Sequence, residues 1–378
     1  MRSESRELLD KYFMAYSCED DAENREIALK WNAEISDEAR KLHEECIIID
    51  TCAFYLETYN WQLKAAKPTA LNLTVPSVFD PSAGGALDKV IDLLHVVSRY
   101  PEHFINIRTA EDILEAKRTG KVGAIIGAQN CDFIFSREPA ATVEAFSRVG
   151  LRVMQIAYNH RSFAADGCAT GTDAGITAQG REMIRAMERY GVTVDLSHVG
   201  CRSTLEAMDY VTKPVIFSHS NPKALFDRPR NITDEQAKKC AEIGGVIGAV
   251  AFAPNLYDGE NLPTIDRYID AIAYFADLVG IDHVGIGLDS NAEPGAYNRQ
   301  DARHIADGSF REDSPESMYD KAFAAGKGKA SIYTDGIFGV ANYPNIVDKL
   351  LKRGFSHDDV RKIMGENFLR VFKQTWTN

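Results

Sequence analysis

The chain has 378 residues, of which 45% are hydrophobic and 26% charged, a composition typical of a soluble globular protein with a large core. This composition excludes disordered and fibrous proteins. The formal net charge of -12 argues against nucleic acid or an anionic membrane surface as the main partner, because both bind basic surfaces, so we expect a small-molecule substrate.

The amino-terminal stretch MRSESRELLDKYFMAY contains neither an apolar signal region nor a small-residue cleavage site. No later stretch reaches the roughly 18 uninterrupted apolar residues of a membrane span. The seven cysteines are odd in number and show no CxxC spacing, which favours reduced thiols over disulfides. We therefore expect a cytoplasmic protein that does not associate with a membrane.

The first 40 residues are charged and weakly amphipathic, and they predict an N-terminal helical extension (1–40) packed outside a main domain (41–378). From residue 41 onward, short apolar runs alternate with helical segments. The runs predict eight strands, at 46–50, 122–128, 152–158, 192–197, 214–218, 244–252, 283–289 and 336–340.

Helical patterns fill the intervals, at 86–100, 109–120, 176–191, 232–244 and 264–280. Thr109 and Thr233 stand where N-caps belong, acidic residues follow them, and several of the segments close on glycine. Apolar strands that alternate with helices predict a parallel sheet covered on its outside. Eight such units, without a glycine-rich phosphate-binding turn, favour a (β/α)8 TIM barrel over an open doubly wound sheet.

In such a barrel the active site lies at the carboxyl ends of the strands. Polar residues cluster at the predicted ends: Asp50, Cys52, Gln129, Tyr158, His160, His198, His219 and Asp289. A single histidine there is more often a hydrogen-bonded core residue than a ligand. Two histidines in the similar contexts LSHVG and FSHSN, His198 and His219, instead predict a shared divalent-metal site.

Two further positions have competing interpretations. Asp289, in GIGLDSN, is either a third metal ligand, a general base for the nucleophilic water, or a cap of the next element. Arg228 and Arg230 follow the fifth predicted strand, where a guanidinium would suit a substrate carboxylate. A structural ion pair with Asp227 or Asp234 is the equally simple alternative.

The stretches VDLSHVG, KPVIFSHS, RPRNITDEQ, GGVIGAV, DHVGIGLDSN and GENFLRVF resemble, in the same order, the renal (membrane) dipeptidase family of the amidohydrolase superfamily. The resemblance runs from about residue 41 to the end. It implies a metal-dependent hydrolase that cleaves dipeptides on a (β/α)8 barrel with two zinc ions.

Carried over residue by residue, the resemblance implies that half of the binuclear site is missing. The family's first strand ends in Asp-Gly-His-Asn-Asp, whose histidine and second aspartate bind one zinc. This chain has Asp50, Thr51, Cys52, Ala53 and Phe54 in that order. The family's bridging glutamate aligns with Gln129, whose amide cannot supply an anionic bridge.

The two histidines of the other zinc match His198 and His219, so the resemblance implies one divalent ion per chain, with zinc as the expected metal. Gln129, Asp289, Cys52 or water would complete its coordination.

The family's catalytic aspartate matches Asp289, its carboxylate-binding arginine matches Arg230, and the histidine that steadies its tetrahedral intermediate falls on Tyr158. His160 and Cys52 join Arg230 as candidate substrate contacts, His160 because it lies two residues beyond Tyr158 and would point the same way in an extended strand.

Three functions remain open. The first is a one-metal hydrolase acting on a dipeptide or other small amide with a carboxylate. The second is an enzyme of other chemistry on the same barrel, such as a lyase, a decarboxylase or a non-peptide hydrolase. The third is a non-catalytic small-molecule binding protein. The oligomeric state, with a homodimer among the options, is not determined by the sequence.

Overall fold

The computed structural model describes residues 21–54, 56–74, 82–256, 263–291, 334–337 and 339–376. Its centre is a sheet of parallel strands that closes on itself, because β1 pairs with both β2 and β9. The strands of the described residues are β1 (Ile49–Phe54), β2 (Ala70–Thr74), β3 (Phe104–Ile107), β4 (Val122–Ala128), β5 (Leu151–Gln155), β6 (Thr193–Asp195), β7 (Ile216–Phe217), β8 (Val246–Ala249), β9 (Val284–Ile286) and β10 (Ser290–Asn291).

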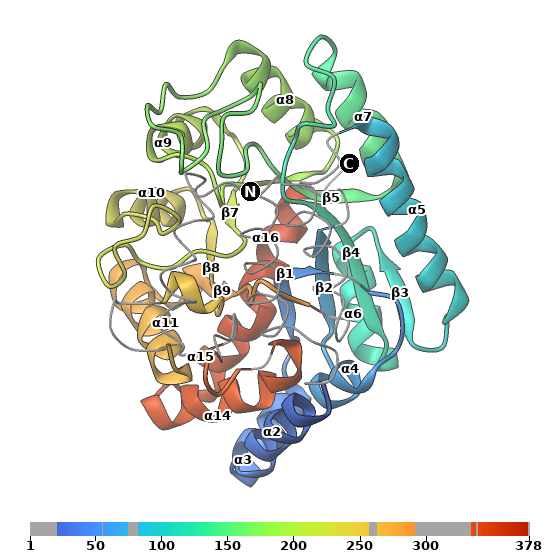
Figure 1. Ribbon diagram of the computed structural model, residues 1–378, viewed down its shortest axis with the longest axis vertical. Coiled ribbons are helices and arrows are strands. Elements are labelled where there is room, and N and C mark those ends of the chain that lie inside the picture. The colour runs from blue at the N-terminus through green and yellow to red at the C-terminus, as the bar shows by residue number, and fades with distance from the viewer. Residues whose placement is uncertain are drawn as a thin grey trace, which may run out of the picture.

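Eight of these strands form the barrel in the order β1-β2-β4-β5-β6-β7-β8-β9. The additional strand β3 pairs with the first part of β4, before β4 begins to pair with β5. Helices surround the barrel (Figure 1), so the predicted (β/α)8 fold is confirmed. Parallel strands run with their carboxyl ends at the same end of the barrel, which brings the residues that follow them together.

The described helices are α2 (Asp21–Ala33), α3 (Asp37–Glu45), α4 (Trp61–Ala66), α5 (Ala83–Arg99), α6 (Ala110–Thr119), α7 (Pro139–Val149), α8 (Ala178–Arg189), α9 (Cys201–Tyr210), α10 (Asp234–Glu242), α11 (Ile265–Val279), α14 (Tyr343–Arg353), α15 (His357–Arg361) and α16 (Asn367–Thr375). Short 3-10 turns are η2 (Ala253–Asn255), η3 (Ile281–His283) and η4 (Gly339–Asn342), and η5 (Lys362–Glu366) is π-helical. The predicted N-caps are confirmed, because Thr109 and Thr233 each complete a capping box at the start of α6 and α10.

One predicted strand is wrong, and one strand of the barrel was not predicted. The run 336–340 is not a strand: Gly336 and Gly339 have φ of 93° and 64°, and η4 begins at Gly339. The eighth barrel strand is β2, which the sequence pattern does not reveal because it is short and has the polar Asn72 at its centre. In the barrel this side chain is buried and donates a hydrogen bond to the Thr51 carbonyl at 2.8 Å.

The first strand is also placed differently from its prediction. It was expected at 46–50, with Cys52 beyond its end, but β1 runs from Ile49 to Phe54 and Cys52 lies inside it. Its pairing with β2 shifts register between Asp50 and Ala53. The residues that seemed to follow a strand are therefore part of the barrel wall.

The barrel interior changes from apolar to polar along the strands. Near the amino ends, Ile49, Val153 and Ile216 form one hydrophobic cluster with aromatic residues of α16. Two residues further along each strand the side chains point inward again, and there Thr51, Gln155 and Ser218 are buried and polar. This polar layer separates the apolar base of the barrel from the residues at its carboxyl end.

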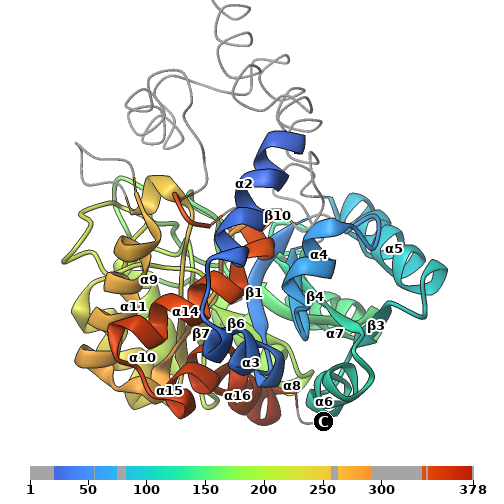
Figure 2. The same ribbon diagram turned by 90° about the horizontal axis from the view of Figure 1, so that it is seen from below.

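The amino-terminal helices pack beside the barrel. Helices α2 and α3 lie along α14, as Figure 2 shows, and Ser36 is tied to the Asp348 carboxylate by two hydrogen bonds of 2.9 Å. Helix α3 runs through residue 40, and the separation of an extension (1–40) from the barrel stays a prediction. None of the described helices combines the length and apolar character that crossing a membrane requires.

Candidate metal centre

The predicted site residues converge at the carboxyl end of the barrel. Gln129 directly follows β4, His198 and His219 follow β6 and β7 by three and two residues, and Asp289 follows β9 by three. Cys52 approaches the same point from within β1. Parallel strands deliver all of them to one end of the barrel, as the sequence predicts.

The two histidines face each other through one nitrogen each. Both side chains are buried, and the Nε2 atoms of His198 and His219 are 2.9 Å apart. Two nitrogens bound to one tetrahedral zinc at its usual bond length would be about 3.3 Å apart. The separation is therefore close to that of two ligands of one ion.

The hydrogen-bond partner of Nδ1 determines the tautomer of each histidine. His198 Nδ1 lies 2.7 Å from the Asn159 amide oxygen, which can only accept a hydrogen bond. His219 Nδ1 lies 2.7 Å from the Ser218 hydroxyl, whose own hydrogen is donated to the Asp195 carboxylate at 2.5 Å. Both Nδ1 atoms therefore carry the hydrogen, and both Nε2 atoms present a lone pair to the same point.

Two lone pairs aimed at one point suit a cation bound between them. Burial lowers the pKa of both imidazoles well below the usual value, and the charge of Arg230 acts in the same direction, so neither ring holds a second proton. Neutral imidazoles with Nδ1 held by hydrogen-bond acceptors are the usual form of metal-bound histidine. The residues present thus fit a divalent metal ion.

Cys52, Gln129 and Asp289 complete the cluster. The Cys52 thiol donates to Asp289 Oδ1 at 3.3 Å, and the Gln129 amide nitrogen lies 3.3 Å from the Cys52 sulfur and 3.4 Å from His219 Nε2. Ligand atoms of Cys52, His219 and Asp289 lie within 4.8 Å of one another. Gln129 was predicted as a metal ligand. Its amide nitrogen faces the cluster, whereas only its oxygen could bind an ion, and its role as a ligand stays a prediction.

Cys52 and Asp289 both have pKa values raised by burial. Burial raises the pKa of the Cys52 thiol well above its usual value, and the neighbouring carboxylates of Asp289 and Asp50 add to the rise. Burial also raises the pKa of Asp289, which the charge of Arg230 and hydrogen bonds from Cys52 and Gln129 oppose. Asp289 is partly exposed, so it has access to solvent.

Arg230 is a buried cation close to this cluster. Its side chain is 2% exposed, and its guanidinium donates to the His219 carbonyl at 2.7 Å and the Ser220 hydroxyl at 3.2 Å. Among the described residues it forms no ion pair, so neither Asp227 nor Asp234 is its partner. A buried guanidinium without a carboxylate partner favours binding of an anionic ligand group.

The last two predicted residues, Tyr158 and His160, have different surroundings. The Tyr158 ring stacks on His198 with centroids 4.1 Å apart, which puts it beside a candidate metal ligand. His160 is exposed, and β5 ends at Gln155, so the strand alternation that was expected to orient His160 does not reach it. Its role as a substrate contact stays a prediction.

Sequence reasoning missed four residues that support the site. Asn159, Asp195 and Ser218 orient the histidines, and Asp50 accepts hydrogen bonds from the backbone of Cys52 and Leu288, both at 3.0 Å. Asp195 and Ser218 did leave a signal, because Asp195 is the last residue of β6 and Ser218 directly follows β7. Asp50 was noted only as the end of a predicted strand. Nothing in the sequence marked Asn159 except its position between the candidates Tyr158 and His160.

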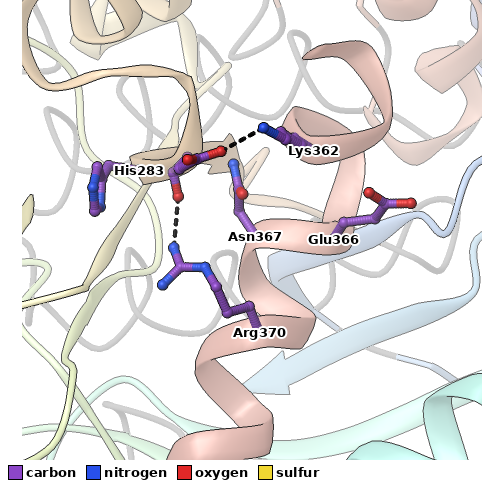
Figure 3. Close-up of a pocket in the computed structure, with 6 residues that line it drawn as sticks. His283, Lys362, Glu366, Asn367 and Arg370 are labelled. Atoms are coloured by element: carbon purple, nitrogen blue, oxygen red, sulfur yellow. Dashed lines mark hydrogen bonds and ion pairs between the residues drawn. The ribbon is translucent and has the colours of Figure 1, made fainter. Parts of the chain in front are cut away.

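A separate hollow lies at the other end of the barrel, beside η3 and α16 (Figure 3). Its basic side chains are already engaged with the protein: Lys362 pairs with the Asp282 carboxylate at 2.7 Å, and Arg370 donates to the Asp282 and Gly244 carbonyls at 2.6 and 2.9 Å. These contacts anchor the carboxyl-terminal helix to the loop before β9. In a barrel of this type such an end serves stability, so we assign the hollow no site.

Comparison with known proteins finds one matching family. The profile of the membrane dipeptidase family, peptidase family M19, matches residues 8–302 and 328–378. The dipeptidase tcpJ of Claviceps purpurea is 26% identical over 317 residues, which cover 83% of this chain and 65% of that protein. The chain thus matches slightly less than two thirds of that relative's length.

Solved structures give the same picture. An amidohydrolase from Pseudomonas aeruginosa is 31% identical, with a TM-score of 0.74 over 89% of this chain and 99% of the other. A metallopeptidase from Rhodobacter sphaeroides, solved with a phosphinate mimic of the dipeptide L-Ala-D-Ala, has a TM-score of 0.69 at 18% identity, over 88% of this chain and 99% of the other. The second likeness concerns the fold alone.

Proposed function

Because the chain belongs to the membrane dipeptidase family, peptidase family M19, we propose that it is a metal-dependent hydrolase of a dipeptide or another small amide that bears a carboxylate. We further propose one ion per chain, with zinc as the expected metal. The observation that carries this proposal is the pair of neutral imidazoles, His198 and His219, whose Nε2 lone pairs face each other at 2.9 Å.

The site's own residues suit the steps of amide hydrolysis. A divalent ion held by the two histidines would polarise the amide carbonyl and lower the pKa of water. Asp289, partly exposed and with a raised pKa, takes the proton of the attacking water and returns it to the leaving amine. Tyr158, stacked on His198, donates a hydrogen bond to the oxygen that becomes negative.

Arg230 selects the substrate. Its buried guanidinium has N–H groups beyond the two that contact Ser220 and the His219 carbonyl, and a substrate carboxylate would pair with them directly. This supports a free carboxylate on the substrate, as a dipeptide has. Among the relatives reported above, none is named as a lyase, a decarboxylase or a binding protein, and no observation at the site favours those alternatives.

We also propose a cytoplasmic location, which is supported by the free thiols of all six described cysteines. A homodimer is a further prediction, and light scattering on the eluting protein would test it.

The function is tested by metal analysis and by matched substrates. We expect one ion per chain in protein purified without added zinc, and loss of that ion in His198→Ala and His219→Ala. Two ions would contradict the one-metal proposal. No ion, even after incubation with zinc, manganese or iron, would contradict metal dependence.

The substrate class is tested with a panel of dipeptides and their carboxamides. We expect hydrolysis of dipeptides with kcat/KM about 10- to 100-fold above that of the amides, since a charged hydrogen bond contributes about 1.5–3 kcal/mol. Arg230→Gln, which can still donate to the His219 carbonyl, should remove this preference. Metal-loaded protein that cleaves none of the panel, or Asp289→Asn that retains full turnover, would contradict the proposal.

A further inference from the structure

Cys52 lies within the metal centre rather than beside it. The side chain is fully buried in β1, and its sulfur is 3.3 Å from both Asp289 Oδ1 and the Gln129 amide nitrogen. Ligand atoms of Cys52, His219 and Asp289 lie within 4.8 Å of one another, and His198 lies next to this set, with its Nε2 2.9 Å from that of His219. Among the described residues Cys52 has no disulfide partner.

The two histidines alone make an incomplete site. Catalytic zinc sites usually have three protein ligands and one open position, and nitrogen with sulfur is the donor set that zinc prefers. Neutral imidazoles bring no negative charge to balance the ion, whereas a thiolate brings one. Of the groups in the cluster, the Cys52 sulfur can provide this third ligand while leaving the Asp289 carboxylate free.

We propose that Cys52 is the third protein ligand of the single metal ion and binds it as a thiolate beside His198 and His219. Asp289 then remains available to take the proton of the attacking water. This inference rests on the proposed metal dependence of the protein and is independent of the substrate.

The proton of the thiol has a route out of the site. When the ion binds, the S–H bond breaks and a sulfur–metal bond forms, with no change of oxidation state. The proton passes to Asp289 Oδ1, which the thiol already faces at 3.3 Å, and from this partly exposed carboxylate to solvent. The Gln129 amide N–H, 3.3 Å from the sulfur, then donates to a negatively charged acceptor.

Gln129 is thereby assigned a different role from that of a metal ligand. Its nitrogen faces the sulfur, so it acts on the ligand and not on the ion. Groups that contact a metal ligand, and not the metal itself, orient that ligand and adjust its basicity.

Cobalt(II) tests the proposal, because a thiolate bound to cobalt gives a near-ultraviolet charge-transfer band that nitrogen and oxygen ligands do not give. Metal-free wild-type protein titrated with cobalt should show this band together with the visible d–d bands. Cys52→Ser should lose the charge-transfer band. Its zinc affinity should fall by more than about 100-fold, because loss of an outer-shell partner alone costs 10- to 100-fold.

Cys131→Ser is the matched control. Cys131 is also a fully buried thiol and lies two residues beyond Gln129, but its sulfur contacts the Ile156 carbonyl at 3.0 Å. This variant should keep both sets of bands. A charge-transfer band that persists in Cys52→Ser would overturn the proposal.

X-ray absorption on the zinc-loaded wild type gives a result that does not depend on any variant folding. One sulfur at about 2.3 Å from zinc, with lighter atoms at about 2.0 Å, is expected. A bound ion surrounded only by nitrogen and oxygen would overturn the role of Cys52 and leave the proposed function standing. Wild-type protein that binds neither cobalt nor zinc would overturn both.

Discussion

At the scale of single residues, the metal centre is built on unusual backbone conformations. Among the described residues other than glycine, four have positive φ, and three of these are in the site: Asn159 (53°), His198 (66°) and Asp289 (58°). This region costs free energy for residues other than glycine, although asparagine, aspartate and histidine adopt it more often than the others. Such strain persists where surrounding contacts over-determine it, and here one such contact is the hydrogen bond from His198 Nδ1 to the Asn159 amide oxygen, which aims Nε2 at His219.

Asn159 provides the residue-scale prediction. Asn159→Ala removes the acceptor that keeps the hydrogen on His198 Nδ1, so the ring can adopt the tautomer whose Nε2 no longer offers a lone pair. We expect zinc affinity to fall about 10- to 100-fold, measured by competition with a chromophoric chelator.

The control for this prediction is Asn159→Asp, which keeps an acceptor oxygen and tolerates positive φ. It should retain zinc better than Asn159→Ala. Equal zinc affinity in the wild type and Asn159→Ala would show that the amide does not set the tautomer.

At the scale of elements, the contacts between neighbouring helices hold the barrel's outer layer near β1. His43 of α3 is buried and donates from Nε2 to the carbonyl of Ala66, the last residue of α4, at 2.9 Å. Lys117 of α6 donates to the carbonyls of Glu44 and Cys46 at the end of α3. One polar contact thus joins α3 to α4, and another joins α3 to α6.

His43 makes stability at this junction depend on pH. Burial lowers its pKa to about 4, and Lys117 contributes in the same direction. Below about pH 6.5 His43 therefore binds a proton in the unfolded chain but stays neutral in the folded protein. Its contribution to stability is fully present above that pH and is lost as the pH falls toward 4.

We expect the wild type to lose about 2 kcal/mol of unfolding free energy from His43 between about pH 7.5 and about pH 5. His43→Gln keeps an N–H donor for Ala66 but does not titrate. Urea unfolding at the two pH values should therefore show a smaller loss for the variant by about this amount. Parallel pH dependences would refute the assignment.

At the scale of the whole molecule, the two ends of the barrel have separate tasks. The carboxyl end carries the candidate metal centre, while α16 and its C-cap residue close the amino end with Phe368, Phe372 and Trp376. The rings of Phe372 and Trp376 stack with centroids 4.2 Å apart, and Trp376 Nε1 donates to Thr193 Oγ1 at 2.9 Å. The polar layer of the interior lies between these two ends.

Phe372→Ala tests this separation. Removing a fully buried aromatic ring should lower the free energy of unfolding by about 3–5 kcal/mol, measured by denaturant titration. The folded variant should still bind metal like the wild type, because the site is at the other end. Lys373→Ala, an exposed neighbour on the same helix, should change stability by less than about 0.5 kcal/mol.

The barrel and the meeting of the candidate ligands at one end of it could be predicted from the chain, and the reasons are local. Apolar runs that alternate with capped helices predict a covered parallel sheet, and residues placed after parallel strands must meet at one end. His198, His219 and Asp289 were found in this way. The same reasoning failed at 336–340, because an apolar pattern does not show that Gly336 and Gly339 have positive φ. It also failed at β2, because the pattern does not show that the polar Asn72 is buried.

The sequence by itself determined the fold class, the family and which residue types reach the carboxyl end of the barrel, since these follow from periodicity and order along the chain. Only the tertiary structure decided which nitrogens face each other, that Asn159 and the Ser218–Asp195 pair fix their tautomers, and that Cys52 lies inside β1 with its sulfur in the cluster. These contacts join residues distant in the chain, and their distances and hydrogen-bond directions depend on how the strands close into a barrel.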